Sequence, residues 1–192
     1  MENQRVIRTF VAVGLDEELR SGISAVAERV KKLAPNVKWV APGNLHVTLK
    51  FLGNVREDRI AGIGAALDEV AREIVAFDLS VSGLGVFPNP RKPRVVWVGI
   101  EEGRDQLVAL AGAVEDRLAR AGFEKESKPF KTHITIGRVK EGRPVGDLTD
   151  GLAGIDADKI GAQRVDSVIV MESMLKPEGP EYTPLSVHKL MV

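Results

Sequence analysis

Residues 45–53 read LHVTLKFLG, and residues 132–139 repeat the same arrangement as THITIGRV. Each stretch places a histidine two residues before a threonine within a run of Val, Leu or Ile, a composition typical of a β-strand. The chain has three histidines, and two of them lie in these matching contexts. The repeat predicts a duplicated fold in which each half contributes one His-x-Thr strand.

Side chains of a strand alternate between its two faces, and this decides what each stretch presents. The alternation predicts that polar side chains share one face of each strand: His46, Thr48 and Lys50 in the first, and Lys131, His133 and Thr135 in the second. The opposite faces would pack into the core with Val47, Leu49 and Phe51, and with Phe130, Ile134 and Ile136. If the two strands lie side by side, two imidazoles and two hydroxyls meet in one cleft.

Two histidines and two threonines in one cleft suit chemistry at a phosphate diester. Imidazole titrates near neutral pH, so a neutral histidine can act as general base while a protonated one acts as general acid. Threonine hydroxyls can donate to phosphate oxygens, and nearby Lys or Arg can neutralise developing charge. His46 and His133 are therefore the candidate catalytic residues, with Thr48 and Thr135 as phosphate ligands. The two motifs are nearly symmetric, which leaves the acid and base roles open.

Around these strands the sequence predicts an α+β fold. Apolar residues at helical spacing indicate helices over 16–33, 56–75 and 104–121. Strands are expected over 5–15, 37–40, 45–53, 77–84, 94–100, 133–139, 164–172 and 184–191. No low-complexity tract or linker separates two halves, so residues 1–192 are predicted to form a single domain of two lobes.

Composition excludes several classes of protein. Lys and Arg number 27 and so do Asp and Glu, so the chain has no overall basic character and an RNA partner would need a local patch. Residues 91–94 and 125–143 are candidate patches, although solvated loop charge explains the first equally well. The chain has no cysteine, which rules out disulfides and thiol nucleophiles. No apolar run approaches the roughly 20 residues that span a bilayer, and we expect a cytoplasmic protein without a membrane partner.

Other kinds of site have weaker support. Neither motif has an Asp or Glu within four residues of its histidine, so a metal site is disfavoured and no cofactor is expected. No serine lies in a G-x-S-x-G turn that would indicate a Ser–His–Asp triad. The third histidine, His188, is expected to be structural or to face solvent.

HVTLKFLG (46–53), HITIGR (133–138), RTFVAV (8–13) and a late Gly179…Tyr182 pair together resemble the 2H phosphoesterases. The bacterial and archaeal RNA 2′,3′-cyclic phosphodiesterases, also named 2′-5′ RNA ligases, are the most similar group. The resemblance spans nearly the whole chain, although Thr132 stands where many relatives have proline. It implies a bilobal fold with pseudo-two-fold duplication, in which two antiparallel sheets line a central cleft and helices pack outside.

The same resemblance implies metal-independent hydrolysis of RNA or nucleotide 2′,3′-cyclic phosphate ends to 2′-phosphate, with reversible 2′-5′ RNA ligation as a further activity. His46 would protonate the leaving 3′-oxygen, and His133 would activate water. Arg138 is implied to bind the phosphate, although strict alternation places it opposite His133 unless the strand is irregular near Gly137. No obligate protein partner is expected, and the protein is expected to be a monomer.

Three more residues are candidate nucleotide contacts: Arg8, Phe10 and Lys131. Phe10 could stack on a base, but a core position explains it equally well. Two other functions stay open at this point. The chain could be a non-catalytic module that binds RNA or nucleotides, or it could apply the same chemistry to another cyclic phosphate or to 2′-5′ oligoadenylate.

Overall fold

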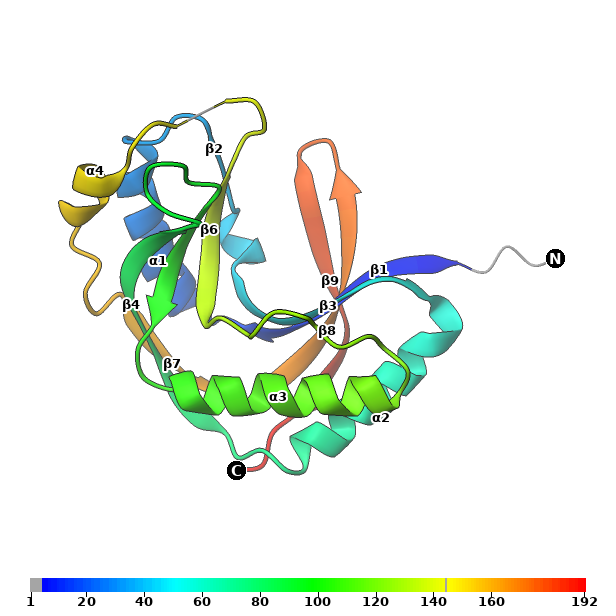
Figure 1. The fold of residues 1–192 in the computed structure, drawn as a ribbon. Helices are drawn as coiled ribbons and strands as arrows, with labels where there is room; N and C mark the ends of the chain where they lie inside the picture. The colour runs from blue at the N-terminus through cyan, green and yellow to red at the C-terminus, as the bar shows by residue number, and fades with distance from the viewer. Residues whose placement is uncertain (1–4, 144) are drawn as a thin grey trace.

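The computed structural model describes residues 5–143 and 145–192 and has two antiparallel sheets (Figure 1). One sheet has the strand order β3-β1-β8-β9, and the other has the order β2-β6-β5-β4-β7. The strands are β1 (Val6–Gly14), β2 (Val37–Trp39), β3 (His46–Arg56), β4 (Phe77–Phe87), β5 (Val95–Ile100), β6 (His133–Val139), β7 (Gly161–Val165), β8 (Ser167–Lys176) and β9 (Gly179–Lys189). The α+β class and the two antiparallel sheets agree with the prediction.

The helices are α1 (Glu17–Lys31), α2 (Ile60–Ala71), α3 (Arg104–Arg120) and the short α4 (Thr149–Ala153), with single 3₁₀ turns η1 (Pro42–Asn44) and η2 (Glu57–Arg59). Asp16 begins α1 by accepting the Leu19 N–H at 2.8 Å, as expected of an N-cap residue. Every helix within 5–143 and 145–192 is too short or too polar to cross a membrane.

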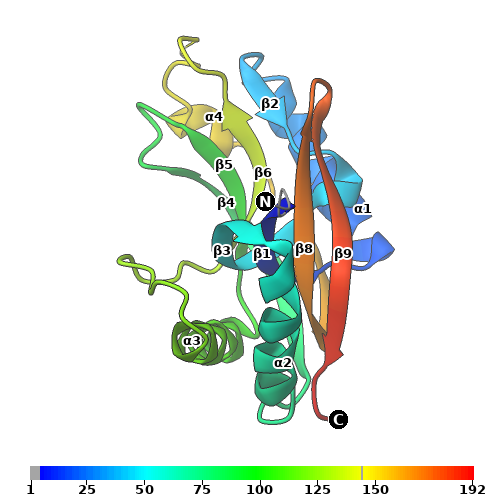
Figure 2. The same ribbon diagram turned by 90° about the vertical axis from the view of Figure 1, so that its right-hand side faces the viewer.

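Two helices connect the two sheets. Each follows a strand of one sheet in sequence but packs against the other sheet. Helix α1 follows β1 but packs against β6 and β7, and α3 follows β5 but packs against β3 and α2 (Figure 2). The apolar stripe of α3, with Leu107, Leu110, Val114 and Leu118, is fully buried. The buried side chains of both sheets form one continuous core, so the two sheets and their helices fold as one unit.

The region near the C-terminus differs from the prediction. A single strand was expected over 164–172, but β7 ends at Val165 in one sheet and β8 begins at Ser167 in the other. The chain therefore changes sheets at Asp166, and β8 and β9 pair as a long hairpin up to Lys176 and Gly179. The local pattern does not show which sheet each segment joins, because Val165 in β7 and Val168 and Val170 in β8 are all buried and only Asp166 and Ser167 separate them.

A β-bulge follows each His-x-Thr motif. In β3, Thr48 lies opposite Ala12 and Lys50 lies opposite Val11, so Leu49 is the extra residue. A bulge shifts the alternation of later side chains by one residue. Lys50 is consequently 3% exposed and Phe51 is 55% exposed. The prediction that Lys50 shares the polar face and that Phe51 faces the core was wrong.

The bulge in β6 is equivalent. Thr135 lies opposite Trp97 and Gly137 lies opposite Val96, so Ile136 is the extra residue. Ile136 and Gly137 are both buried, and Arg138 returns to the exposed side. The strand irregularity that places Arg138 on the same side as His133 is therefore present, and it lies at Ile136, one residue before Gly137.

Candidate active site

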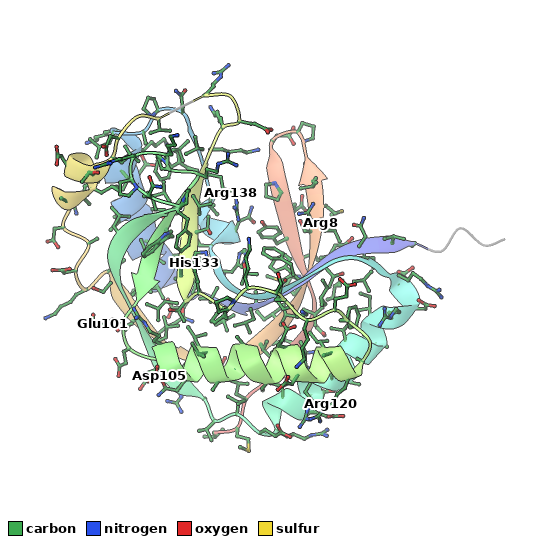
Figure 3. The ribbon with its side chains drawn as sticks, viewed as in Figure 1. Arg8, Glu101, Asp105, Arg120, His133 and Arg138 are labelled. Atoms are coloured by element: carbon green, nitrogen blue, oxygen red, sulfur yellow. The ribbon has the colours of Figure 1, made fainter. Side chains whose placement is uncertain are left out.

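The two His-x-Thr strands line one cavity of about 380 Å³ between the sheets. Strands β3 and β6 contact each other, because β2 covers β6 only at Gly137–Val139 and leaves the His133 end uncovered. Six of the predicted site residues line the cavity: Arg8, His46, Thr48, His133, Thr135 and Arg138. Figure 3 shows Arg8 on β1 on the opposite side of it from His133 and Arg138 on β6.

His46 is held in one tautomer by the backbone. Its Nδ1 lies 2.7 Å from the carbonyl oxygen of Asn44, and a carbonyl can only accept, so Nδ1 carries the proton and donates. Its Nε2 lies 2.8 Å from the Thr48 hydroxyl. The ring packs against Phe10 with centroids 4.9 Å apart, and against the edge of Tyr182 at 5.3 Å. Only Nε2 is left to exchange a proton with a ligand.

His133 is held in the same way in the other half. Its Nδ1 donates to the carbonyl oxygen of Lys131 at 2.7 Å. The ring meets Phe87 at a centroid distance of 5.2 Å in a T-shaped arrangement. In both halves, the carbonyl two residues before the histidine fixes the tautomer and leaves Nε2 for proton transfer.

Burial lowers the pKa of both histidines. It is the largest effect on each, partly opposed by the hydrogen bonds to the Asn44 and Lys131 carbonyls. The positive charge of Arg138 lowers the pKa of both rings further. Both imidazoles therefore favour the neutral form in the free protein, and an anion bound between them would favour protonation.

The described residues that line the cavity include two guanidinium groups, from Arg8 and Arg138, and no carboxylate. Across residues 5–143 and 145–192, no three His, Asp or Glu side chains are grouped in a way that could hold a metal ion. Hydroxyl groups and cations without an acidic partner are donors suited to an anion such as phosphate. The electrostatics therefore favour an anionic ligand.

Two of the predicted nucleotide contacts lie elsewhere. Phe10 is only 3% exposed and packs under His46 and Tyr182, which favours the core alternative. The Nζ of Lys131 lies 4.9 Å above the Phe87 ring, and Lys131 is not among the residues that line the cavity. What Lys131 contributes is its carbonyl, which orients His133.

Several cavity residues had no role in the sequence analysis. Phe51, Leu175 and Tyr182 form its apolar wall, and burial raises the pKa of the Tyr182 hydroxyl. Asn44 supplies the carbonyl for His46, and its side-chain amide donates to the Pro180 carbonyl at 2.7 Å. Phe51 and Arg138 stand at the same distance in sequence after the histidines of their motifs. This match to Arg138 was the sequence signal that could have identified Phe51 as a cavity residue.

His188 is a structural residue between β9 and α2. It is 7% exposed, its Nδ1 lies 2.6 Å from Asp68 and its Nε2 lies 2.8 Å from the Ser186 hydroxyl. The order of these contacts matches a Ser–His–Asp triad, but the histidine is packed against the helix around Gly64. This agrees with the structural alternative for His188.

Comparisons with known proteins fit this arrangement. The family described as LigT-like phosphoesterases matches residues 13–97 and again residues 98–182. The RNA 2′,3′-cyclic phosphodiesterase of Archaeoglobus fulgidus is 38% identical over 183 residues, which are 95% of this chain and 100% of that protein. The protein of the same name from Methanothermobacter thermautotrophicus is 37% identical over 96% of this chain and 99% of that protein.

Solved structures agree in fold. The crystal structure of TT0787 from Thermus thermophilus matches with a TM-score of 0.81 at 30% identity, covering 96% of this chain and 98% of that one. The structure of E. coli LigT complexed with 3′-AMP matches with a TM-score of 0.76 at 26% identity, covering 97% and 99%. With one family match over each half and one His-x-Thr strand in each match, the chain belongs to the LigT-like phosphoesterases of the 2H type.

Proposed function

We propose that this protein hydrolyses the 2′,3′-cyclic phosphate ends of RNA to 2′-phosphates, without a metal ion, by acid and base catalysis from His46 and His133. One observation carries the proposal: two histidines in the same tautomer turn toward one cavity whose described lining has hydroxyl groups and guanidinium groups but no carboxylate. The relatives named RNA 2′,3′-cyclic phosphodiesterase support the reaction class. The solved LigT complex with 3′-AMP supports a nucleotide ligand.

The reaction needs one proton removed and one supplied. His133 Nε2 takes a proton from water, whose oxygen attacks phosphorus in line with the 3′-oxygen. The bond between phosphorus and the 3′-oxygen breaks, and His46 Nε2 gives its proton to that oxygen. The product carries a 2′-phosphate and a 3′-hydroxyl. His133 ends protonated and His46 neutral, so exchange with solvent restores the starting state.

The remaining cavity groups would hold the phosphate. In the free protein, the Thr48 hydroxyl lies against Nε2 of His46 at 2.8 Å, and a bound phosphate would take both as donors once His46 is protonated. Thr135 occupies the matching position beside His133. Arg138 and Arg8 would neutralise the charge that develops on the phosphate oxygens.

Phe51 is the group best placed to contact a nucleobase. The ring is 55% exposed and lines the same cavity as the histidines, whereas Phe10 is covered by His46 and Tyr182. An exposed aromatic ring can stack on any of the four bases. We therefore assign to Phe51 the stacking role that the sequence suggested for Phe10.

We also propose that residues 1–192 act as one domain, since each half supplies one histidine and each sheet is covered by a helix from elsewhere in the chain. A 5′-hydroxyl in place of the attacking water would give a 2′-5′ phosphodiester by the same proton transfers, so ligation would use the same residues. A monomeric state and a cytoplasmic location remain predictions.

A product analysis tests the proposal. An oligoribonucleotide ending in a 2′,3′-cyclic phosphate is incubated with the wild type, His46→Ala and His133→Ala in EDTA, and the 2′- and 3′-phosphate products are separated. We expect a 2′-phosphate from the wild type and a loss of at least about 100-fold in each variant. A 3′-phosphate product, inhibition by EDTA or an active His133→Ala would contradict the proposal. RNA binding without turnover would favour the binding-module alternative.

A further inference from the structure

An RNA whose reactive group is its 3′ end must leave the catalytic cavity in one direction, because all other nucleotides lie on its 5′ side. Two cavities adjoin the catalytic one. The first, which we call the hairpin groove, is about 580 Å³ and lies between β2 and the β8–β9 hairpin (Figure 1). The second, which we call the β3 groove, is about 520 Å³ and lies between β3 and residues 122–126. The RNA could leave by either.

The hairpin groove shares more of its lining with the catalytic cavity than the β3 groove does. The residues that line both the hairpin groove and the catalytic cavity are Val40, Asn44, Arg138, Pro180 and Tyr182. The β3 groove shares only Phe51 with the catalytic cavity. A strand leaving through the β3 groove would therefore have to pass the ring to which we assign base stacking.

The cations of the hairpin groove are available for phosphate. Lys38 and Arg138 line it, and within residues 5–143 and 145–192 neither has a carboxylate within 4.0 Å. A third cation, Lys176, is already paired with Glu181. Lys38 and Arg138 can thus bind RNA phosphates without first breaking an ion pair.

The cations of the β3 groove already have partners. Lys50 is bound to Glu115, Arg56 to Asp58 and Lys125 to Asp116. Arg59 lies 4.1 Å from the centroid of the Phe123 ring and donates to the Ala121 carbonyl. Two further acids, Glu124 and Glu126, line this groove. Acids also line the hairpin groove, namely Glu178 and Glu181, so the difference lies in the cations. Lys38 and Arg138 have no carboxylate within 4.0 Å among the described residues, whereas every cation that lines the β3 groove is already engaged.

Lys38 is the side chain of β2 that faces the hairpin groove. It lies opposite Arg138 in the pairing of β2 with β6, and both line the groove. The neighbouring Trp39 points to the other face of β2, where its ring packs against Gly137 on β6 and against the core. The groove therefore offers an RNA strand its two cations, Lys38 and Arg138.

We propose that the hairpin groove binds the nucleotides immediately 5′ to the cyclic phosphate end, with Lys38 on the RNA phosphate. This inference rests on the proposed function, and it adds the substrate class: an oligoribonucleotide is preferred over a mononucleotide. Lys38 reaches toward the hairpin tip, where its Nζ would lie 4.0 Å from a Cβ at Gly179.

The experiment compares kcat/KM for a 2′,3′-cyclic mononucleotide and for a trinucleotide ending in a 2′,3′-cyclic phosphate. We expect Lys38→Glu to lower the trinucleotide value about tenfold or more and to leave the mononucleotide value within about twofold. The matched control is Lys125→Glu in the β3 groove, which should change neither value. Equal losses on both substrates, or a trinucleotide loss confined to Lys125→Glu, would overturn the inference.

Two further measurements test whether Lys38 contacts an RNA phosphate and whether the groove binds RNA independently of hydrolysis. Lys38→Met should reduce the slope of log kcat/KM against log salt by about 0.7 for the trinucleotide, as loss of one phosphate contact to a single strand predicts. If the wild type hydrolyses neither substrate, the proposed function is wrong. In that case, fluorescence anisotropy of a labelled trinucleotide 3′-phosphate tests whether the hairpin groove binds RNA. Weaker binding by Lys38→Glu than by the wild type supports the inference, and unchanged binding overturns it.

Discussion

Phe51 and Arg138 occupy matching positions in the two halves of the chain: each stands three residues after the threonine of its motif, and each lines the same cavity. One backbone device produces both placements, because a bulge at Leu49 and another at Ile136 shift the strand alternation by one residue. The two halves thus present an aromatic ring on one side and a cation on the other. A nearly symmetric cleft becomes suited to an asymmetric ligand with a base at one end and a phosphate at the other.

Replacing Phe51 by alanine should mainly weaken substrate binding. Base stacking on an aromatic ring contributes about 1–3 kcal/mol, so we expect KM for a 2′,3′-cyclic nucleotide to rise roughly tenfold with kcat nearly unchanged. Because the ring is 55% exposed, thermal stability should hardly change. Steady-state kinetics check this, with Phe51→Trp as the variant that should retain a low KM. An unchanged KM in Phe51→Ala would show that the base binds elsewhere.

Replacing Arg138 by methionine should raise the pKa of both His46 and His133. Burial is the main cause of their lowered values and stays in place, but the positive charge that adds to it is removed. Proton NMR titration of the two imidazoles measures the change. The activity should fall by roughly 100-fold, because Arg138 also neutralises the phosphate.

Arg91→Met, in an exposed loop, is the control for the Arg138 variant and should leave both histidine titrations in place. If the two pKa values stay the same in Arg138→Met, the guanidinium does not act on the rings. The placement of Arg138 at the reacting phosphate would then lose its electrostatic support.

Replacing Lys50 by methionine should destabilise the protein without affecting catalysis. The Lys50 Nζ is buried and donates to both carboxylate oxygens of Glu115 and to the Glu124 carbonyl at 2.7–2.9 Å. Leaving one member of a buried ion pair unpartnered costs about 3–5 kcal/mol, which lowers Tm by roughly 6–20 °C in a chain of this size. Calorimetry and kinetics on the folded enzyme measure the two effects separately.

Two variants complete the Lys50 test. Lys125→Met, which removes an exposed ion pair with Asp116, should leave Tm nearly unchanged. The double variant Lys50→Met/Glu115→Leu should recover part of the lost stability, since no buried charge is left unpaired. A Lys50→Met protein with normal Tm and low kcat/KM would instead place this side chain in the cleft, as simple alternation predicts.

The chemistry of the site could be predicted from the sequence because it depends on short-range pattern. His46 and Thr48, like His133 and Thr135, lie two residues apart on a strand, and period-two alternation alone places them on one face. The buried stripe of α3 was equally visible in its helical spacing. The pairing of the two motifs in one cavity required only that the duplicated halves face each other.

The errors came from features that a local pattern does not encode. The alternation failed at Lys50 and Phe51 because a bulge depends on how β3 pairs with β1, and that register is not written in either strand alone. The prediction of a single strand over 164–172 failed because the sheet that each segment joins depends on its pairing with distant strands. Phe10 was ambiguous because a buried ring and a stacking platform have the same sequence signature on a strand.

The division of proton transfer between His46 and His133 is the central claim, and the pH dependence of kcat/KM tests it most directly. The base must be neutral and the acid protonated, so activity should rise with pH through one pKa and fall through the other. Because burial lowers the pKa of both rings, the maximum should lie below the ordinary imidazole value of about 6.5. The two apparent values belong to the pair.

The measurement is kcat/KM between pH 4 and 9 on one 2′,3′-cyclic nucleotide for the wild type, His46→Gln and His133→Gln. The account predicts a bell-shaped profile for the wild type, loss of the rising limb in the low residual activity of His133→Gln and loss of the falling limb in that of His46→Gln. A flat wild-type profile, or a variant that keeps both limbs at near-normal rates, would contradict it.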